Sequence, residues 1–359
     1  MNWPNISSRA GKMMMPNNAR SLLFHIIYTP NTVRTLLPFV ETLLRWSDCA
    51  YCLVSNGCDD EEMSLLRTRC AGEPRLRWRS LPWPRKVEHG QALNFLFAAS
   101  NEPSFCFMDS DILATGDFMA ELLPAMSGAA GLFSAWPITI KAEERMLSDA
   151  CSFIGGRHSH TADGRCLGGS YFAIYERAAL ACALAQAPDG FNRGYWAQLP
   201  RRMRQFLRKI GQERRFYDTG RVLNLFLQQQ GGALRVHDCA ALLHLGSYSI
   251  YAGSAQRTVP RWRRLAQAVL RRVRNQLNGQ TYRDAVLHQV AQDPVQRSVD
   301  QRRARLAGYF ARLAAALAAG EDLPEPVELQ DAELDDNVKR ATAILAMAQS
   351  QRQEAEKLP

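Results

Sequence analysis

The sequence predicts an α/β protein in which helices flank a mostly parallel, Rossmann-like sheet, followed by a C-terminal helical extension. Two observations favour this fold class. Between residues 21 and 111, short apolar runs alternate with stretches of helical periodicity, a pattern typical of βαβ units. Beyond about residue 259 the β-prone runs stop, and the chain carries helical patterns only.

The N-terminal part of the chain contains four expected strands separated by three expected helices. Each strand is a short run of apolar, β-branched or aromatic residues, and these runs stop at turn residues such as Pro or Asn-Gly. The helices have apolar residues at helical spacing, and the first of them is expected to continue through Pro38. The expected strands cover residues 21–30, 50–57, 76–82 and 104–108, and the expected helices cover 31–46, 60–70 and 89–100.

The second half of the chain has a looser pattern. Residues 131–140 are compatible with a strand, and residues 168–184 predict a glycine turn, a short strand and a helix. Residues 216–232 predict a turn and an amphipathic helix that stops at a Gly-Gly pair, as helices often do. Further β-structure is expected over 234–249, and helices after 259 are interrupted by an acidic, Pro-containing linker at 320–330.

Composition limits the class of protein. The 359 residues are 47% apolar and 22% charged, with a net charge of +9, which is ordinary for a globular protein with a sizeable core. No apolar run approaches the roughly 20 residues that span a bilayer, and the first 20 residues lack a signal-peptide core. The nine cysteines are scattered and odd in number. We therefore expect a cytoplasmic protein with reduced thiols.

In the stretch FCFMDSDI, an expected hydrophobic strand is followed directly by Asp109 and Asp111. Unpaired carboxylates are costly in apolar surroundings, so something should compensate them. Hard oxygen ligands suit Mg²⁺ or Mn²⁺. The alternative is that Asp109 caps a turn. Parallel strands place their carboxyl ends at one edge of a sheet, so the stretches YTP, SNG and DSD should lie near one another.

Seven short motifs in this order resemble the GT-A glycosyltransferases, particularly the family 2-like enzymes, over roughly residues 20–250. They are HIIYTP, LVSNG, HGQALNFLFAAS, FCFMDSDI, GGSYFAIYERAAL, FYDTG and HLGS. The resemblance implies a GT-A catalytic domain at 20–255, after a flexible N-terminus at 1–19 and before a helical region at 256–359. It also implies a hexosyltransferase that uses a nucleotide-diphosphate sugar.

The resemblance assigns a role to each motif. It implies that the nucleotide donor lies against Thr29, Pro30, Asn56, Gly57, His89, Gly90, Asn94, Asp109, Ser110 and Asp111. Gly168, Gly169 and Ser170 match the loop on the acceptor and sugar side. Asp218 matches the catalytic base of inverting members. His244, together with Asp109 and Asp111, matches the ligands of a Mn²⁺ or Mg²⁺ ion.

Several points depart from the family or stay open. The usual acidic pair at the base position is Tyr-Asp here, so Asp218 stands alone and could instead be a helix N-cap. His244 could be a core histidine, and His158 and His160 could be plain loop residues. The chain lacks the Gln-x-x-Arg-Trp motif of processive synthases. Two hypotheses compete with this interpretation. One is a nucleotidyltransferase on the same type of sheet, and the other is a non-catalytic protein that binds nucleotide sugar or nucleic acid.

The expected partners follow from the same resemblance and from charge. UDP is the first expectation for the donor base, and the acceptor is a glycan, a lipid-linked or a small-molecule hydroxyl compound. Nucleic acid is not expected, because no nucleic-acid motif accompanies the basic charge. Residues 261–277 predict a helix with an apolar stripe that starts at Trp262 and is flanked by arginines. This helix either packs on the catalytic domain or touches an anionic membrane at the inner face.

Overall fold

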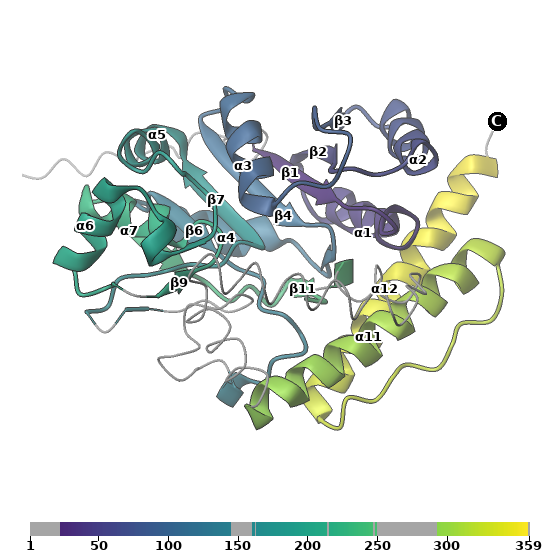
Figure 1. The fold of residues 1–359 in the computed structure, drawn as a ribbon. Coiled ribbons are helices and arrows are strands. Elements are labelled where there is room, and N and C mark those ends of the chain that lie inside the picture. Colours follow the sequence, from purple (N-terminus) through teal and green to yellow (C-terminus); the bar gives the residue numbers. More distant parts are fainter. Residues whose placement is uncertain are drawn as a thin grey trace, which may run out of the picture.

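The computed structural model describes residues 22–144, 160–161, 163–213, 215–246, 248–249 and 293–357. The expectations for the N-terminal 1–19, for His158 and for the 261–277 helix fall outside these residues. Within them, the expected fold class is confirmed. Helices flank a mostly parallel seven-stranded sheet, and two long helices follow at the C-terminal end (Figure 1).

The central sheet has the strand order β10-β6-β7-β4-β1-β2-β3. Strands β1 to β4 run parallel to one another, and β7 is antiparallel to both of its neighbours. The strands are β1 (Leu23–Tyr28), β2 (Ala50–Ser55), β3 (Leu76–Ser80), β4 (Ser104–Asp109), β6 (Gly131–Phe133), β7 (Phe172–Glu176) and β10 (Leu234–Val236). Two small antiparallel pairs lie outside this sheet. They are β5 (Ile112–Ala114) with β11 (Leu242–His244), and β8 (Gly194–Tyr195) with β9 (Phe216–Tyr217).

Alternating side chains of the strands supply two separate cores. In β4, Cys106 and Met108 belong to one hydrophobic cluster, whereas Phe105 and Phe107 belong to the other, because successive strand residues point to opposite faces. The first cluster packs against α1 (Val33–Trp46), α4 (Phe118–Met126) and the C-terminal helices. The second packs against α3 (His89–Ala98), α5 (Arg177–Gln186), α6 (Arg201–Lys209) and α7 (Arg221–Gln229).

The boundaries of the elements expected over residues 21–108 agree closely with the sequence pattern, whereas later expectations hold only in part. Residues 131–140 form a strand only over Gly131–Phe133. The rest leaves the sheet and meets β11 through the backbone of Pro137 and Ile138, because Pro137 has no N–H to donate to a strand ladder. Helix α7 is not amphipathic along its first two turns, since every residue from Arg221 to Leu227 is buried.

The C-terminal helices belong to the first core. Helix α11 (Pro294–Ala319) and helix α12 (Ala332–Lys357) lie side by side and cover α1 (Figure 1). Tyr309, Phe310 and Leu313 of α11 are at most 1% exposed in the same cluster as the apolar face of α1. Helix α2 (Asp60–Ala71) closes the edge of the sheet beside β3. No helix within the described ranges is long and apolar enough to cross a membrane.

Candidate metal and donor-binding site

The carboxyl ends of β1, β2 and β4 open onto a cavity of about 700 Å³. This is the edge where a parallel sheet presents ligands, and it brings together segments that are far apart in the sequence, as the strand-end argument predicted. Six of the residues singled out in the sequence line the cavity: Thr29, Asn56, His89, Asp109, Ser110 and Asp111. The hydroxyl oxygen of Thr29 is buried there without a hydrogen-bond partner in the described part of the chain.

Asp109, Asp111 and His244 form one compact cluster at this edge. Their ligand atoms all lie within 4.8 Å of one another. Asp109 is the last residue of β4, and the short β5 that follows pairs with β11 so that His244 stands opposite Ile112. His244 Nε2 lies 3.2 Å from Asp111 Oδ1 and 3.9 Å from Asp109 Oδ2. The β5–β11 pair is thus the element that delivers the histidine to the carboxylates.

The histidine has the geometry of a metal ligand. Its Nδ1 lies 3.1 Å from the carbonyl oxygen of Ala135, so Nδ1 must carry the proton that is donated in this bond. Nε2 is buried and makes no well-aligned hydrogen bond within the described residues. In the neutral ring its lone pair therefore faces two carboxylates. A backbone carbonyl that fixes the tautomer of a histidine in this way is the usual support of a metal-bound imidazole.

The electrostatics of the cluster call for a positive species between the three side chains. Burial, followed by the charge of Asp111, raises the pKa of Asp109 to about 8. Burial disfavours the charged form of His244, but the carboxylates of Asp111 and Asp109 outweigh it and raise its pKa. Burial likewise opposes ionisation of Asp111, yet His244 and the N–H of Tyr248 hold its pKa below the usual range. A divalent cation satisfies the same charge balance as bound protons do.

Asn56 and Gly57 act on the loop that follows β3. The Asn56 side chain exchanges two hydrogen bonds with the backbone of Val87, at 3.1 and 2.9 Å. Gly57 has φ +77°, and a Cβ there would overlap the backbone of Lys86. The Asn-Gly turn therefore holds the loop that carries Lys86 into the cavity. Pro30 is half-buried beside Thr29 and does not line the cavity.

Gly90 and Asn94 hold a different loop. A Cβ on Gly90 would overlap the carbonyl of Phe191. The Asn94 amide donates to the carbonyl oxygen of Asp189 at 3.1 Å and accepts from the N–H of Phe191 at 2.9 Å. These two residues thus grip the loop that leads to Arg193, which lines the cavity.

Asp218 lies next to this loop at the end of β9. It is half-buried, and its charge acts on Asp109 and on His89. Helix α7 begins at Arg221 with Gly220 as its N-cap, which makes no side-chain capping bond. In the described structure, therefore, Asp218 does not occupy the N-cap position that was the alternative reading. Arg221 beside it is fully buried. Burial lowers the pKa of its guanidinium, and the charge of Asp218 acts in the opposite direction and raises it.

The glycine loop before β7 does not line the cavity. Gly168 has φ +65°, and a Cβ there would overlap the ring of Phe133. Gly168 and Gly169 are buried, and Ser170 is half-buried. The backbone of Ser170 bonds the ring of His89. His160 is exposed and pairs with Cys166 through the backbone.

Two cationic residues that line the cavity were not among the site residues predicted from the sequence. Lys86 and Arg193 both line the cavity, and Arg193 makes an ion pair of 2.8 Å with Glu88 on the opposite loop. Arg193 does open a basic stretch of the sequence, but neither residue stands in a recognisable motif. Their positions depend on the Asn56 and Asn94 contacts described above.

Within the described residues, no cysteine belongs to a group that could hold a metal ion. Cys49 and Cys52 have the spacing of a C-x-x-C pair, but their side chains belong to different hydrophobic clusters. Burial raises the pKa of each to about 11, so both are inert thiols.

No family model and no curated protein matches the sequence. Solved structures similar to the chain include the mannosyltransferase PcManGT from Pyrobaculum calidifontis in complex with GDP-Man and Mn²⁺ (TM-score 0.40, 13% identity, 93% of this chain and 87% of that chain). Others are the galactosyltransferase LgtC with donor and acceptor sugar analogs (0.39, 12%, 67% and 82%) and S. aureus TarS 1–349 (0.40, 12%, 87% and 98%). These TM-scores are below 0.5, so the function of this chain is inferred from its own site residues.

Proposed function

We propose that this chain is a metal-dependent glycosyltransferase, of the hexosyltransferase type, that moves a sugar from a nucleotide-diphosphate sugar to a hydroxyl acceptor. One observation carries the proposal. The Asp109, Asp111 and His244 cluster lies beside a cavity of about 700 Å³ whose other side chains include the cations Lys86 and Arg193. Two carboxylates with a tautomer-fixed imidazole suit Mn²⁺ or Mg²⁺, and flanking cations suit a diphosphate.

The residues divide the work of binding the donor. Thr29 and the end of β2 would face the nucleoside, with UDP as the first donor to test. Lys86 and Arg193 would pair with the phosphates. A divalent cation held by Asp109, Asp111 and His244 would neutralise the diphosphate and make it a better leaving group.

Asp218 is the proposed base of an inverting transfer. Its carboxylate would accept the proton of the acceptor hydroxyl while that oxygen forms a bond to the sugar carbon and the bond from that carbon to the diphosphate breaks. The nucleoside diphosphate then leaves with the electron pair. The support is the position of Asp218 beside the cavity loops and its electrostatic influence on Asp109 and His89.

Thermal-shift measurements test the proposal directly. UDP-, GDP- and dTDP-sugars are screened with Mn²⁺, with Mg²⁺ and with EDTA. One nucleotide sugar should raise the melting temperature only when the metal is present. Asp109→Ala and Asp111→Ala should remove this shift, while Asp322→Ala in the exposed linker keeps it. Donor stabilisation that persists in EDTA would contradict the metal assignment.

Product analysis separates the proposal from its rivals. Sugar transfer releases a nucleoside diphosphate, whereas a nucleotidyltransferase releases pyrophosphate and a binding protein releases neither. Acceptor screening would include glycan, lipid-linked and small-molecule hydroxyl compounds. The proposal also includes a cytoplasmic location, with contact to the inner membrane face through residues 261–277. Sedimentation with anionic liposomes at low and high salt tests the membrane contact.

A further inference from the structure

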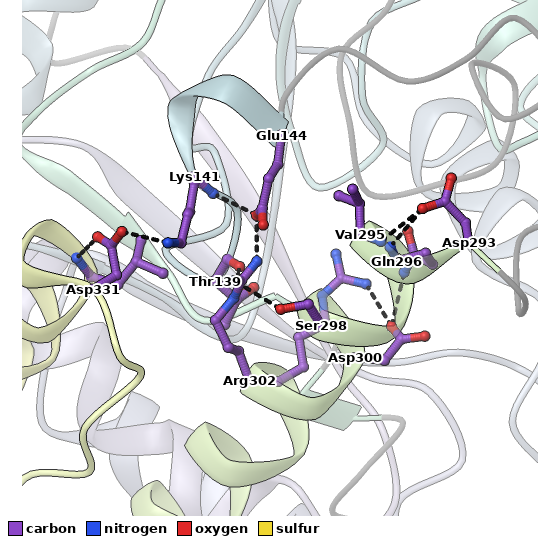
Figure 2. Close-up of polar contacts among 12 residues, drawn as sticks. Thr139, Lys141, Glu144, Asp293, Val295, Gln296, Ser298, Asp300, Arg302 and Asp331 are labelled. Carbon is purple, nitrogen blue, oxygen red and sulfur yellow. Dashed lines mark hydrogen bonds and ion pairs between the residues drawn. The ribbon is translucent and has the colours of Figure 1, made fainter.

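Arg302 of α11 is buried, at 6% exposure, and does not line the cavity. Its guanidinium donates from Nε to the carbonyl oxygen of Thr139 at 2.9 Å, from Nη1 to Ser298 Oγ at 3.2 Å and from Nη2 to the carboxylate of Glu144 (Figure 2). A buried guanidinium is costly unless its donors are satisfied, and an ion pair of this kind is weak support for stability. Its presence needs another reason.

The partner of Arg302 is the same segment that holds His244. The carbonyl of Ala135 accepts the Nδ1 proton of His244. The N–H of Ile138 donates to the His244 carbonyl at 2.8 Å. Thr139, which Arg302 bonds, is the next residue. One short segment therefore joins α11 on one side to the histidine of the metal cluster on the other.

This segment is strained where it meets the histidine. Ala135 has φ +63°, a left-handed conformation that costs a non-glycine residue free energy and persists only when its surroundings enforce it. Two contacts tie the residues that follow Ala135 to the C-terminal region. One is the bond from Arg302 to Thr139, and the other joins Lys141 Nζ to Asp331, just before α12, at 2.7 Å (Figure 2).

Docking of α11 does not need this arginine. The helix already buries Leu306, Tyr309, Phe310 and Leu313 in the core shared with α1. Two of the three hydrogen bonds of Arg302 instead go to residues 139–144, one to the Thr139 carbonyl and one to the Glu144 carboxylate, and the third stays within α11 at Ser298. The first two are therefore suited to fixing that segment in space.

We propose that Arg302 is a positioning residue for the metal site, and that the C-terminal helical region thereby sets the geometry of His244. This inference rests on the metal site of the proposed function. Arg302 would hold residues 135–140 in the one conformation that presents the Ala135 carbonyl to Nδ1 and so directs Nε2 at Asp109 and Asp111.

The test compares Mn²⁺ affinity in the full-length chain, measured by calorimetry, for the wild type, Arg302→Met and Leu313→Ala. Loss of support behind a metal ligand typically weakens binding 10- to 100-fold, so Arg302→Met should bind Mn²⁺ at least about 10-fold more weakly. Leu313→Ala destabilises the same helix but leaves the hydrogen bonds of Arg302 to Thr139 and Glu144 in place, so it should bind like the wild type. Arg302→Lys, which keeps one donor, should recover part of the affinity.

A second readout does not depend on metal. Nitrogen NMR of the metal-free protein, recorded at a pH above the raised pKa of His244 so that the ring is neutral, reports its tautomer, which should be the Nδ1-protonated form in the wild type and a mixture in Arg302→Met. Unchanged Mn²⁺ affinity and an unchanged tautomer in Arg302→Met, beside a wild type that binds Mn²⁺, would overturn this inference alone. A wild type that binds no Mn²⁺ would overturn the proposed metal site, and the inference with it.

Discussion

At the scale of single residues, the candidate site consists of groups whose charges are set by their neighbours. The half-buried Asp109 and the buried Asp111 share one corner of the site with His244. The backbone carbonyl of Ala135 fixes the tautomer of that histidine. Burial is the main cause that raises the pKa of Asp109, and the charge of Asp218 also acts on Asp109 and raises it further. Each group is poised for binding or proton transfer by contacts that come from a different element.

The first prediction concerns Asp218. Asp218→Asn keeps the shape of the side chain but cannot accept the acceptor proton, so the transfer rate should fall by about 100-fold or more. Donor affinity should stay unchanged, because the residue does not line the cavity. Steady-state kinetics with calorimetry of donor binding measures both. Asp189→Asn, on the loop that Asn94 grips, is the control. Full turnover in Asp218→Asn would mean that another group is the base.

The second prediction concerns stability in acid. Burial lowers the pKa of His89 to about 4, against the opposing charge of Asp218. The unfolded state then binds more protons than the folded state between pH 4 and about 6.5, so stability falls as the pH drops through this window. The free energy of unfolding should fall by about 2 kcal/mol from this residue between pH 7 and pH 5. Urea unfolding of the wild type and of His89→Gln at both pH values measures it, and an equal pH dependence in the two proteins would refute it.

At the scale of elements, two short motifs work as clamps on loops. The Asn-Gly turn after β2 grips the loop of Lys86, and Gly90 with Asn94 in α3 grips the loop of Arg193. The sequence resemblance assigned these motifs to direct donor contact. Of the four residues, only Asn56 lines the cavity, and its amide is also bonded to Val87. In the proposed function, the clamps would act on the donor chiefly through the cations that they position.

The third prediction separates backbone strain from close approach. Gly57 and Gly211 both have positive φ, at +77° and +68°, but only Gly57 is in contact with another chain segment. Gly211→Ala should cost about 1 kcal/mol from its conformation alone. Gly57→Ala must also displace the backbone of Lys86, so it should cost more and weaken donor binding as well. Chemical denaturation and donor titration of both variants check this, and equal effects on donor affinity would argue against the clamp.

At the scale of the whole molecule, the C-terminal helices are part of the folded core. Helices α11 and α12 contribute Phe310, Leu313 and Val338 to the cluster that contains the apolar face of α1. The ring of Phe310 packs edge-on against Phe39 of α1, with centroids 6.0 Å apart. The sequence-based division at residue 256 stays a prediction, but the packing favours cooperative unfolding of the two parts.

The fourth prediction follows from this packing. Phe310→Ala should lower the free energy of unfolding by about 3–5 kcal/mol, and the whole protein should still unfold in one transition. The exposed Arg312→Ala on the same helix should change it by about 0.5 kcal/mol or less. Urea unfolding followed by circular dichroism and by tryptophan fluorescence tests this. Separate transitions by the two probes would show that the C-terminal region folds independently.

Most strands and helices of the N-terminal half, together with the paired carboxylates of Asp109 and Asp111, are predictable from the sequence pattern. Apolar runs and turn residues are local signals, so β1, β2 and β4 could be predicted within a few residues. Once the strands are parallel, their ends share one edge, which placed Thr29, Asn56 and Asp109 together.

The long-range contacts that those elements make depend on the tertiary structure. The tautomer of His244 depends on Ala135, more than 100 residues away, and the place of Arg193 depends on Asn94. Arg302 meets Thr139 across an even longer separation. Such contacts are set by the order of strands and the packing of helices rather than by neighbouring residues. No local pattern in the sequence encodes them.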